Sequence, residues 1–381
     1  MDAKVSIVPC DEYTLEKAIA ALTCVLEPLG GLSWVKQGMK IVIKANLVMK
    51  KSPAAAATTH PILIEALAKM LTEKGASVII GDSPGGIYTL PYLSLIYNAT
   101  GMTALENKKK GIFLNRNFEV GEAVYPDGAV LKSFQYTKFL DEADAIINFC
   151  KLKTHGMMAY SGACKNLFGA IPGTRKPEYH YHYPKHEDFA NILVDLVEYF
   201  KPTLHIADAV YGMEGNGPTA GTPRFIGALL ASKNPHALDV AGAHIMGLQA
   251  KDVPTLSAAV KRGLTPDSVS NLQIYGKLED FIVPDYKTVD ARKITQIRSH
   301  GKIVNKTLET LLNHKPVLKY PEKCIGCKEC FKTCPAKAIE MVDKKPVINK
   351  KTCIRCFCCQ EFCPVGALGV HRSVIARVLS K

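Results

Sequence analysis

The stretch CIGCKECFKTCP at residues 324–335 decides the C-terminal fold of this chain, and CIRCFCCQEFCP at residues 353–364 repeats its spacing. Four cysteines stand at matching places in the two stretches, and a proline follows the last matching cysteine of each. Every cysteine of the first stretch recurs 29 positions later. A repeat of this kind indicates a duplicated structural unit.

The spacing of these cysteines is that of an iron–sulfur site. A Cys-x-x-Cys-x-x-Cys loop wraps three thiolates around one cubane cluster, and the fourth ligand comes from the other half. The predicted ligands of one 4Fe-4S cluster are Cys324, Cys327, Cys330 and Cys363, and those of the second are Cys353, Cys356, Cys359 and Cys334. We therefore predict a two-cluster ferredoxin domain of the bacterial type, which is a small α+β fold.

Neither a zinc site nor a set of disulfides accounts for the cysteine repeat. Zinc sites usually show two Cys-x-x-Cys pairs rather than triplets, and disulfides would not generate a proline-terminated duplicate. Between the two loops, residues 340–348 have the pattern of a short hairpin. Cys358 occupies the position at which the first loop has Glu329, so we interpret it as a spare thiol near the cluster rather than a ligand.

The chain of 381 residues is long enough to form a sizeable domain outside the cysteine repeat. No apolar run approaches the roughly 18 residues of a membrane-spanning helix, and the N-terminal residues do not resemble a secretory leader. The cysteines outside the cluster set are irregularly spaced, as in a reducing compartment. We therefore expect a cytoplasmic protein without membrane contact, in an anaerobic or strictly reducing setting.

The formal net charge of +13 raises the question of a nucleic-acid partner. The basic residues are spread through the chain and accompany no nucleic-acid-binding motif, so we expect no nucleic acid. Residues 321–371 hold nine Lys or Arg against five Asp or Glu. This local excess predicts an acidic redox partner, such as a small ferredoxin or flavodoxin.

Short apolar runs alternate with helical patterns through the first part of the chain. Strands are predicted at residues 41–47, 77–82, 145–150, 204–209 and 226–231, and helices at 61–74, 188–200, 236–246 and 255–261. This alternation predicts an α/β domain with a mixed or mostly parallel sheet and covering helices. We expect this domain at residues 1–319, the ferredoxin domain at 320–371 and a basic C-terminal helix at 372–381.

The densest group of polar side chains outside the cysteines follows the third predicted strand, between residues 151 and 186. Small residues beside Lys165 allow a ligand to approach the backbone, and a helix that begins near Ser161 would offer free N–H groups to an anion. The candidate site residues of this segment are His155, Ser161, Gly162, Lys165, Asn166, His180 and His182. The histidines can bind a metal, or they can equally belong to a solvated loop.

Further polar side chains stand where predicted strands end. Lys44 and Asn46 end the first strand and Asp82 ends the second, and α/β proteins usually place ligands at this edge of the sheet. Glu214 follows the strand at 204–209 in a glycine-rich loop. It is a candidate metal ligand or proton carrier, and an ordinary surface loop is the alternative.

Together these segments resemble the bacterial and archaeal family known as domain of unknown function 362. The resemblance is carried by KANL at 44–47, GDSPGG at 81–86, KLKTHG at 151–156, GACKNLFG at 162–169 and EGNGP at 214–218. It covers nearly the whole chain, and members of the family often end in a ferredoxin module. The resemblance implies an iron–sulfur protein and names no reaction.

A second resemblance is to the nickel-pincer lactate racemase superfamily, in which a cofactor-holding lysine follows a histidine by ten positions and precedes Pro-Gly. His155, Lys165 and Pro172-Gly173 match that layout. By analogy Lys165 would anchor a cofactor or substrate, and His155, His180 or His182 would be an acid–base group or a ligand. The superfamily's Asp-x-Thr-Arg element is absent, which argues against racemisation.

Two functions remain open on the sequence alone. The first is an oxidoreductase in which low-potential electrons pass from two clusters to an unknown substrate or cofactor beside Lys165 and Asp82. A flavin such as FMN would convert single electrons into pairs, and another metal or organic cofactor is the alternative. The second is an electron-transfer or activator protein that reduces a partner protein and has no chemistry of its own.

Overall fold

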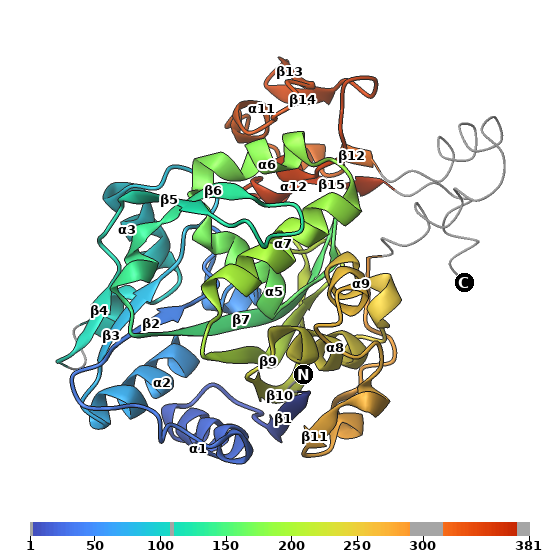
Figure 1. Ribbon diagram of the computed structural model, residues 1–381. Coiled ribbons are helices and arrows are strands. Elements are labelled where there is room, and N and C mark those ends of the chain that lie inside the picture. Colours follow the sequence, from blue (N-terminus) through green and yellow to red (C-terminus); the bar gives the residue numbers. More distant parts are fainter. Residues whose placement is uncertain (1–2, 107–109, 290–314, 372–381) are drawn as a thin grey trace.

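A mostly parallel sheet forms the main domain of the computed structural model, which describes residues 3–106, 110–289 and 315–371 (Figure 1). Its strand order is β11-β1-β10-β9-β7-β2-β3-β4, and β8 pairs with β7. The antiparallel pairs of this sheet are those of β10 with β1 and β9, and that of β8 with β7. The predicted α/β fold is therefore confirmed.

The strands of this sheet are β1 (Lys4–Pro9), β2 (Lys40–Lys44), β3 (Ser77–Gly81), β4 (Ile112–Leu114), β7 (Ala145–His155), β8 (Ala159–Ser161), β9 (Leu204–Glu214), β10 (Thr222–Ser232) and β11 (Gln273–Tyr275). The helices are α1 (Leu15–Leu26), α2 (Pro61–Glu73), α3 (Leu90–Ala99), α4 (Thr103–Glu106), α5 (Ala163–Asn166), α6 (Lys176–His182), α7 (His186–Phe200), α8 (Pro235–Ile245) and α9 (Pro254–Lys261). A hairpin of β5 (Val120–Val124) and β6 (Ser133–Thr137) stands apart from the sheet. All predicted strands and helices of this domain are present, and β7, β9 and β10 extend beyond their predicted ends.

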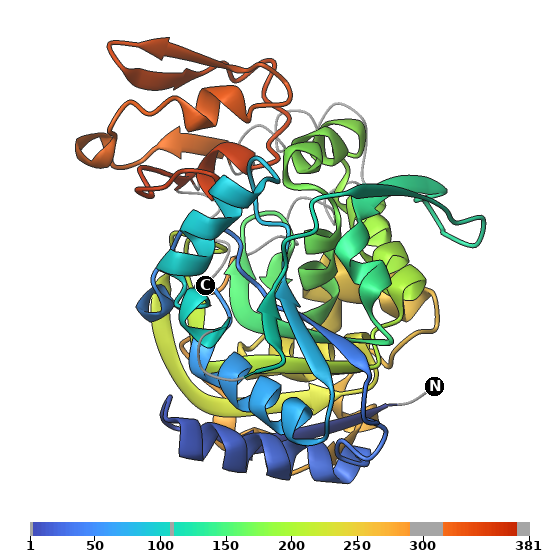
Figure 2. The same ribbon diagram turned by 90° about the vertical axis from the view of Figure 1, so that its left-hand side faces the viewer.

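Helices cover both faces of the sheet because successive side chains of a strand point to opposite sides. Ile41 and Ile43 of β2 belong to the core that includes α1 and α2, whereas Val42 between them packs with Phe139 on the other face. The helices α5 and α8 lie on that second face (Figure 2). The sheet is thus buried on both sides, which explains the continuous apolar runs of its strands.

The chain changes direction at β2, and this creates a candidate site. From β2 the chain moves outward to β3 and β4, and then returns to β7 on the opposite side of β2. Both β3 and β7 run parallel to β2. Open α/β sheets bind ligands at the carboxyl ends of the strands that flank such a switch point.

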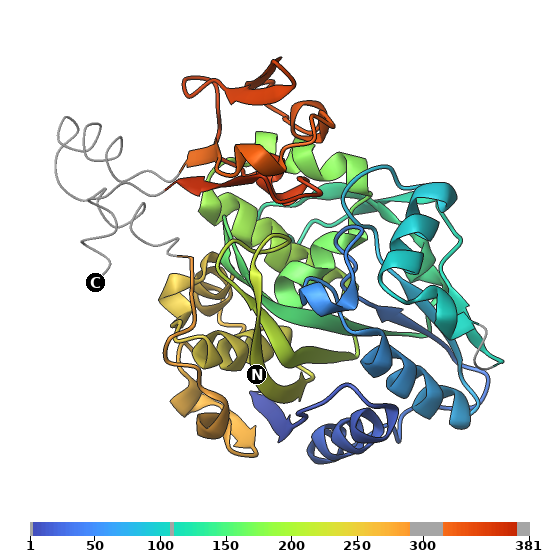
Figure 3. The same ribbon diagram turned by 180° about the vertical axis from the view of Figure 1, so that it is seen from behind.

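The C-terminal module spans residues 315–371 and lies over the end of the sheet where β7 and β9 finish (Figures 1 and 3). It contains the pair β12 (Lys315–Leu318) and β15 (Leu368–His371), the hairpin β13 (Ile339–Val342) and β14 (Lys345–Ile348), and the short helices α11 (Glu329–Lys332) and α12 (Cys358–Glu361). The predicted hairpin is present. The first paired strand begins slightly before the boundary predicted near residue 320.

The predicted C-terminal helix at 372–381 lies outside the described residues. Within the described ranges, none of the helices has the length and apolar character needed to cross a membrane.

Candidate functional site

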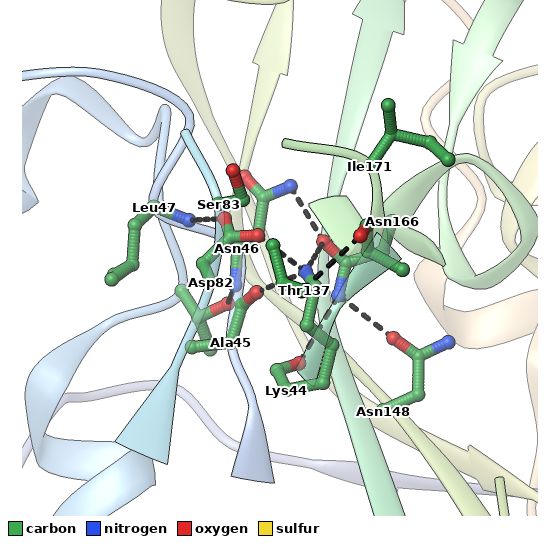
Figure 4. A network of polar contacts seen from close by, with 12 residues as sticks. Lys44, Ala45, Asn46, Leu47, Asp82, Ser83, Thr137, Asn148, Asn166 and Ile171 are labelled. Atoms are coloured by element: carbon green, nitrogen blue, oxygen red, sulfur yellow. Dashed lines mark hydrogen bonds and ion pairs between the residues drawn. The ribbon is translucent and has the colours of Figure 1, made fainter. Parts of the chain in front are cut away.

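A buried ion pair forms the floor of the site at the carboxyl ends of β2 and β3. Lys44 Nζ lies 2.7 Å from Asp82 Oδ1, and both side chains are buried from solvent. Lys44 also donates to the Ala45 carbonyl oxygen, and Asp82 Oδ2 accepts from the Leu47 N–H (Figure 4). Burial lowers the pKa of Lys44, and the neighbouring Asp82 opposes that shift. The pair is therefore internally neutralised and fixed in place.

Three asparagines continue this network across the switch point. Asn46 Nδ2 donates to Asn166 Oδ1 at 2.8 Å, and Asn166 Nδ2 donates to Asn148 Oδ1 at 2.7 Å (Figure 4). Lys153 Nζ donates to Asn46 Oδ1 and to the Ala57 carbonyl oxygen, both at 2.7 Å. Because each amide has its oxygen and nitrogen engaged, the network holds β2, β7 and α5 in one arrangement.

Two more lysines point into the same region from beyond β7. Lys176 Nζ donates to the carbonyl oxygens of Ser83 and Ile171, at 2.6 and 2.7 Å. Lys165 Nζ lies 4.5 Å from the centre of the Phe168 ring. Burial lowers the pKa of Lys165, and it lowers the pKa of both Lys153 and Lys176 to about 7. Lys153 and Lys176 are therefore poised to change protonation near neutral pH.

His155 ends β7 with one ring nitrogen committed to the backbone. Its Nδ1 accepts from the N–H groups of Met157 and Met158, at 3.1 and 3.2 Å. Burial moves the pKa of His155 well below its ordinary value, so the ring is neutral. With Nδ1 accepting, the proton belongs on Nε2. That nitrogen is buried, has no hydrogen-bond partner in the part of the chain that the structure describes, and lies 3.8 Å from Glu361 Oε2.

These groups surround one small cavity of about 50 Å³. The polar and charged side chains that line it are Asn46, Asp82, Ser83, Lys153, His155, Ser161, Lys165, Asn166, Lys176 and Glu361. All but Glu361 come from the main domain. Glu361 is the last residue of α12, so the C-terminal module completes the wall.

The module is held against this cavity by specific polar contacts. Gln360 Nε2 donates to Asn216 O, Asn216 Oδ1 and Gly217 O, at 3.0, 3.2 and 3.2 Å. Thr219 Oγ1 donates to the Glu361 carbonyl oxygen at 2.9 Å. Gly85 allows the closest approach, because a Cβ there would come within 2.2 Å of the Phe362 ring. The interface therefore depends on side chains of α12 and on the loop after β9.

The cysteines of the module fit the predicted cluster sets. Cys324, Cys327, Cys330 and Cys363 line a single cavity together with apolar side chains. The electrostatic neighbours of Cys359 include Cys353, Cys356 and Cys334, which are its predicted partners. The N–H of Ala338 donates to Cys334 Sγ and that of Ala367 to Cys363 Sγ, each at 3.2 Å. Hydrogen bonds of this kind to cluster thiolates tune reduction potential.

Several predicted site residues lie together and others do not. Lys44, Asn46, Asp82, His155, Ser161, Lys165 and Asn166 line or underlie the cavity. Glu214 lies elsewhere, with its carboxylate against the backbone N–H and side chain of Lys287. The structure places His180 and His182, which the sequence left open as metal ligands or as part of a solvated loop, in different surroundings. Both stand on helix α6, where His180 is buried against Phe189 and His182 is exposed.

The predicted anion site at the start of a helix near Ser161 is also corrected. The helix α5 begins after Gly162, and its first N–H groups, those of Ala163 and Cys164, donate to the buried Asp239. Gly162 is needed for that approach, because a Cβ would come within 2.1 Å of Asp239 Oδ1. The backbone donors are thus used inside the protein, and the lysines are left as the positive groups of the cavity.

Sequence reasoning missed Ser83, Lys153, Lys176 and Glu361 as site residues. Lys153 could have been predicted, because it stands two residues before the candidate His155 in the same strand, and alternate residues of a strand point to the same face. Glu361 could also have been singled out. It occupies the repeat position equivalent to Lys332, 29 residues earlier, and has the opposite charge.

Comparisons with known proteins agree with this two-part architecture. Residues 41–244 match a family described as domain of unknown function (DUF362), and residues 316–364 match a 4Fe-4S dicluster domain. A thylakoid-associated protein of Synechocystis sp. is 30 % identical over 295 aligned residues, and the match covers 75 % of this chain and 88 % of that protein. The C-terminal module is thus a ferredoxin-like domain, which gives the chain an iron–sulfur electron-transfer role.

Further similarities are local or distant. A polyferredoxin-like protein of Methanocaldococcus jannaschii is 44 % identical over 57 residues, covering 12 % of this chain and 34 % of that protein. Among solved structures, the lactate racemase apoprotein of Thermoanaerobacterium thermosaccharolyticum has 12 % identity and a TM-score of 0.40, covering 64 % of this chain and 56 % of that one.

Proposed function

The chain belongs to the DUF362 family, whose description names no reaction. From the site itself we propose that the protein is a ferredoxin-coupled oxidoreductase. It passes electrons from two 4Fe-4S clusters to a small substrate held in the cavity beneath the C-terminal module. The observation that carries this proposal is the position of Glu361, which belongs to the module and lines the same cavity as Asp82 and Lys165. Electron donor and substrate would thus be held at a fixed separation.

The chain's own residues bind and protonate the substrate in this proposal. When bound, two 4Fe-4S clusters supply one electron each, and a substrate that takes up both electrons also takes up two protons. Lys165 binds the substrate, and the His155 Nε2–H donates a hydrogen bond to it. Lys153, with a pKa of about 7, is a suitable proton donor at neutral pH. The Lys44–Asp82 pair positions these groups.

The predicted FMN does not fit this cavity. Its volume of about 50 Å³ is well below the roughly 300–1,000 Å³ of ordinary small-molecule pockets. We therefore propose that electrons reach the substrate directly, without a flavin or another organic cofactor at this position. An acidic ferredoxin or flavodoxin in a reducing cytoplasm would supply them.

A second candidate function is electron delivery to another protein. It is favoured by the exposed surface of the first cysteine loop, where Cys327 is exposed and Ile325 and Phe331 are 66 % and 50 % exposed. In that case the outer loop would both receive and release electrons, and the cavity would take no part.

The test is cluster reoxidation in anaerobically purified protein. The clusters are reduced, small oxidised compounds are added, and reoxidation is followed by absorbance in the wild type and in Lys165→Met and Lys69→Gln. The oxidoreductase predicts a compound whose reduction is lost in Lys165→Met and retained in Lys69→Gln, where a surface lysine of α2 changes. Reoxidation by a protein acceptor alone, unaffected by Lys165→Met, would support the electron carrier instead.

A further inference from the structure

The cavity holds more positive than negative groups. Three lysines line it, namely Lys153, Lys165 and Lys176, and its carboxylates are Asp82 and Glu361. Asp82 is already engaged by Lys44 below the cavity. Among the described residues that line the cavity, Glu361 is therefore the carboxylate left to face three lysines. Protonated lysines would leave positive charge uncompensated in a buried space.

The hydrogen-bond partners of these lysines are neutral. Lys153 is bonded to an amide oxygen and a carbonyl oxygen, and Lys176 is bonded to two carbonyl oxygens. Lys165 has aromatic neighbours, Phe168 at 4.5 Å and Phe189 at 5.9 Å. Buried ammonium groups are stable only when paired or fully hydrogen-bonded. Neutral acceptors of this kind orient the lysines without neutralising them.

Two buried donors lining the cavity also lack partners. Ser83 Oγ and His155 Nε2 have no hydrogen bond to any described residue, although the two residues are only 1 % and 2 % exposed. Buried polar groups of native proteins are nearly always satisfied. Both groups can donate, the hydroxyl by rotation and the imidazole through its Nε2–H. A ligand rich in acceptor oxygens would satisfy both.

We infer that the cavity is a binding site for one small oxyanion, either a short carboxylate or an inorganic oxyanion such as phosphate. The volume of about 50 Å³ corresponds to roughly four water positions at about 10–15 Å³ each, which matches the heavy atoms of such an ion. This inference rests on the proposed function, since it names the substrate class of that same cavity. Lys165, Ser83 and the His155 Nε2–H would donate to its oxygens.

Binding of the anion should change the protonation of Lys153 and Lys176. Burial lowers the pKa of Lys153 and Lys176 to about 7, and a bound anion would raise both again. The other charged groups that act on these two lysines are Lys44, Asp82, Lys151, Lys165 and Glu361. Above pH 7 the site should therefore take up protons when the anion binds.

The test uses the full-length protein with oxidised clusters and no reductant. Inorganic phosphate, formate, acetate, malonate and succinate are titrated calorimetrically at pH 7.5, in two buffers with different ionisation enthalpies. Lys165→Met and Lys153→Met are compared with Lys69→Gln, which removes the same charge from the exposed side of α2, and thermal unfolding verifies that each variant is folded.

We expect saturable binding of at least one of these anions with proton uptake, weakened about 10- to 100-fold in both methionine variants and unchanged in Lys69→Gln. Strong phosphate binding would identify an inorganic oxyanion, and strong binding of a short carboxylate would identify an organic acid. Binding that is absent at about 10 mM, or equal in all variants, would overturn the inference. Because no electrons flow in this assay, its failure is distinct from failure of the proposed electron transfer.

Discussion

The two halves of the cysteine repeat have the same backbone and opposite surroundings. The helices α11 and α12 follow equivalent residues with left-handed backbone, Lys328 at φ 64° and Phe357 at φ 61°. The side chains that surround the cluster ligands differ between the halves. The equivalent pairs are Lys328 and Phe357, Glu329 and Cys358, Phe331 and Gln360, and Lys332 and Glu361. Lys328, Phe331 and Lys332 are exposed and Glu329 is partly exposed, whereas Phe357, Cys358 and Gln360 are buried.

The two halves have the same residues at the positions that hold clusters. They have different residues at the positions where the second half contacts the main domain. Gln360 and Glu361 form the contacts to the loop after β9 and to the cavity, while Lys328 and Lys332 remain exposed and basic. We propose that electrons enter through the outer half, which is the first cysteine loop, and leave through the inner half, which is the second. Substitutions at equivalent positions should therefore have different effects.

Loss of a cluster ligand should give the largest effect. Cys359→Ala removes a ligand of the inner cluster, so substrate reduction should fall to background with any reductant. Cys330→Ala removes a ligand of the outer cluster, so reduction by a partner protein should stop while a small chemical reductant still drives turnover. Electron paramagnetic resonance counts the remaining clusters in both variants. Equal loss of activity with a small reductant would contradict the proposed direction.

The pH dependence of the cavity that the inner half covers should be the next largest effect. Substrate affinity should fall about tenfold per pH unit above 7, because Lys153 loses its proton through a pKa of about 7. The unfolding free energy of the ligand-free protein should instead rise as the pH rises above 7. The unfolded chain keeps that proton up to about pH 10.5, so it binds more protons than the folded state in this window, and stability rises with pH.

Substrate KM and unfolding free energy measured between pH 6 and 9 check both signs. Lys153→Met should reduce the slope of both profiles and leave the part that comes from Lys176, whose pKa is also about 7, whereas Lys332→Met in the outer half should leave both profiles unchanged. A KM independent of pH in the wild type would show that Lys153 does not act on the substrate.

Much of the fold followed from the sequence because local patterns determine it. The apolar runs at 77–82 and 145–150 became β3 and β7, and Pro61 opens α2 at its predicted start. The cluster cysteines were predictable because their spacing is itself the chemical constraint. Lys44, Asn46 and Asp82 were found because carboxyl ends of parallel strands meet at one edge.

The rest of the site depends on contacts that spacing does not reveal. Asp239 occupies the N–H groups predicted for an anion, although it is far along the chain in α8. His180 and His182 would point the same way only in an extended segment, and they stand instead on the helix α6. Glu361 reaches the cavity only through docking of the module, which no local pattern encodes.

Docking itself can be tested with a matched pair of alanine variants. Gln360→Ala removes three hydrogen bonds and leaves the buried carbonyl oxygens of Asn216 and Gly217 without this donor. It should cost about 1–3 kcal/mol of unfolding free energy. Phe331→Ala at the equivalent outer position, which is half exposed, should change that value by less than about 0.5 kcal/mol. Anaerobic denaturant unfolding measures both, and equal costs would mean that the inner half is not preferentially docked.

The outer half should show the smallest effect, and only in association rate. Lys328 and Lys332 are exposed beside the first cysteine loop, where they would attract an acidic partner over a screening length of about 10 Å at 0.1 M salt. Lys328→Glu together with Lys332→Glu should slow reduction by an acidic ferredoxin about 10-fold at low salt, and salt should erase the difference because steering is screened. Stopped-flow reduction at two ionic strengths measures this for the double variant and for each single variant, and Lys69→Glu on α2 is the charge-matched surface control for the single variants. A salt-independent loss would indicate damage to the cluster loop, and an unchanged rate would mean that electrons enter elsewhere. A slowed rate confined to low salt, with turnover on a small reductant intact, is what distinguishes a docking surface from a catalytic one.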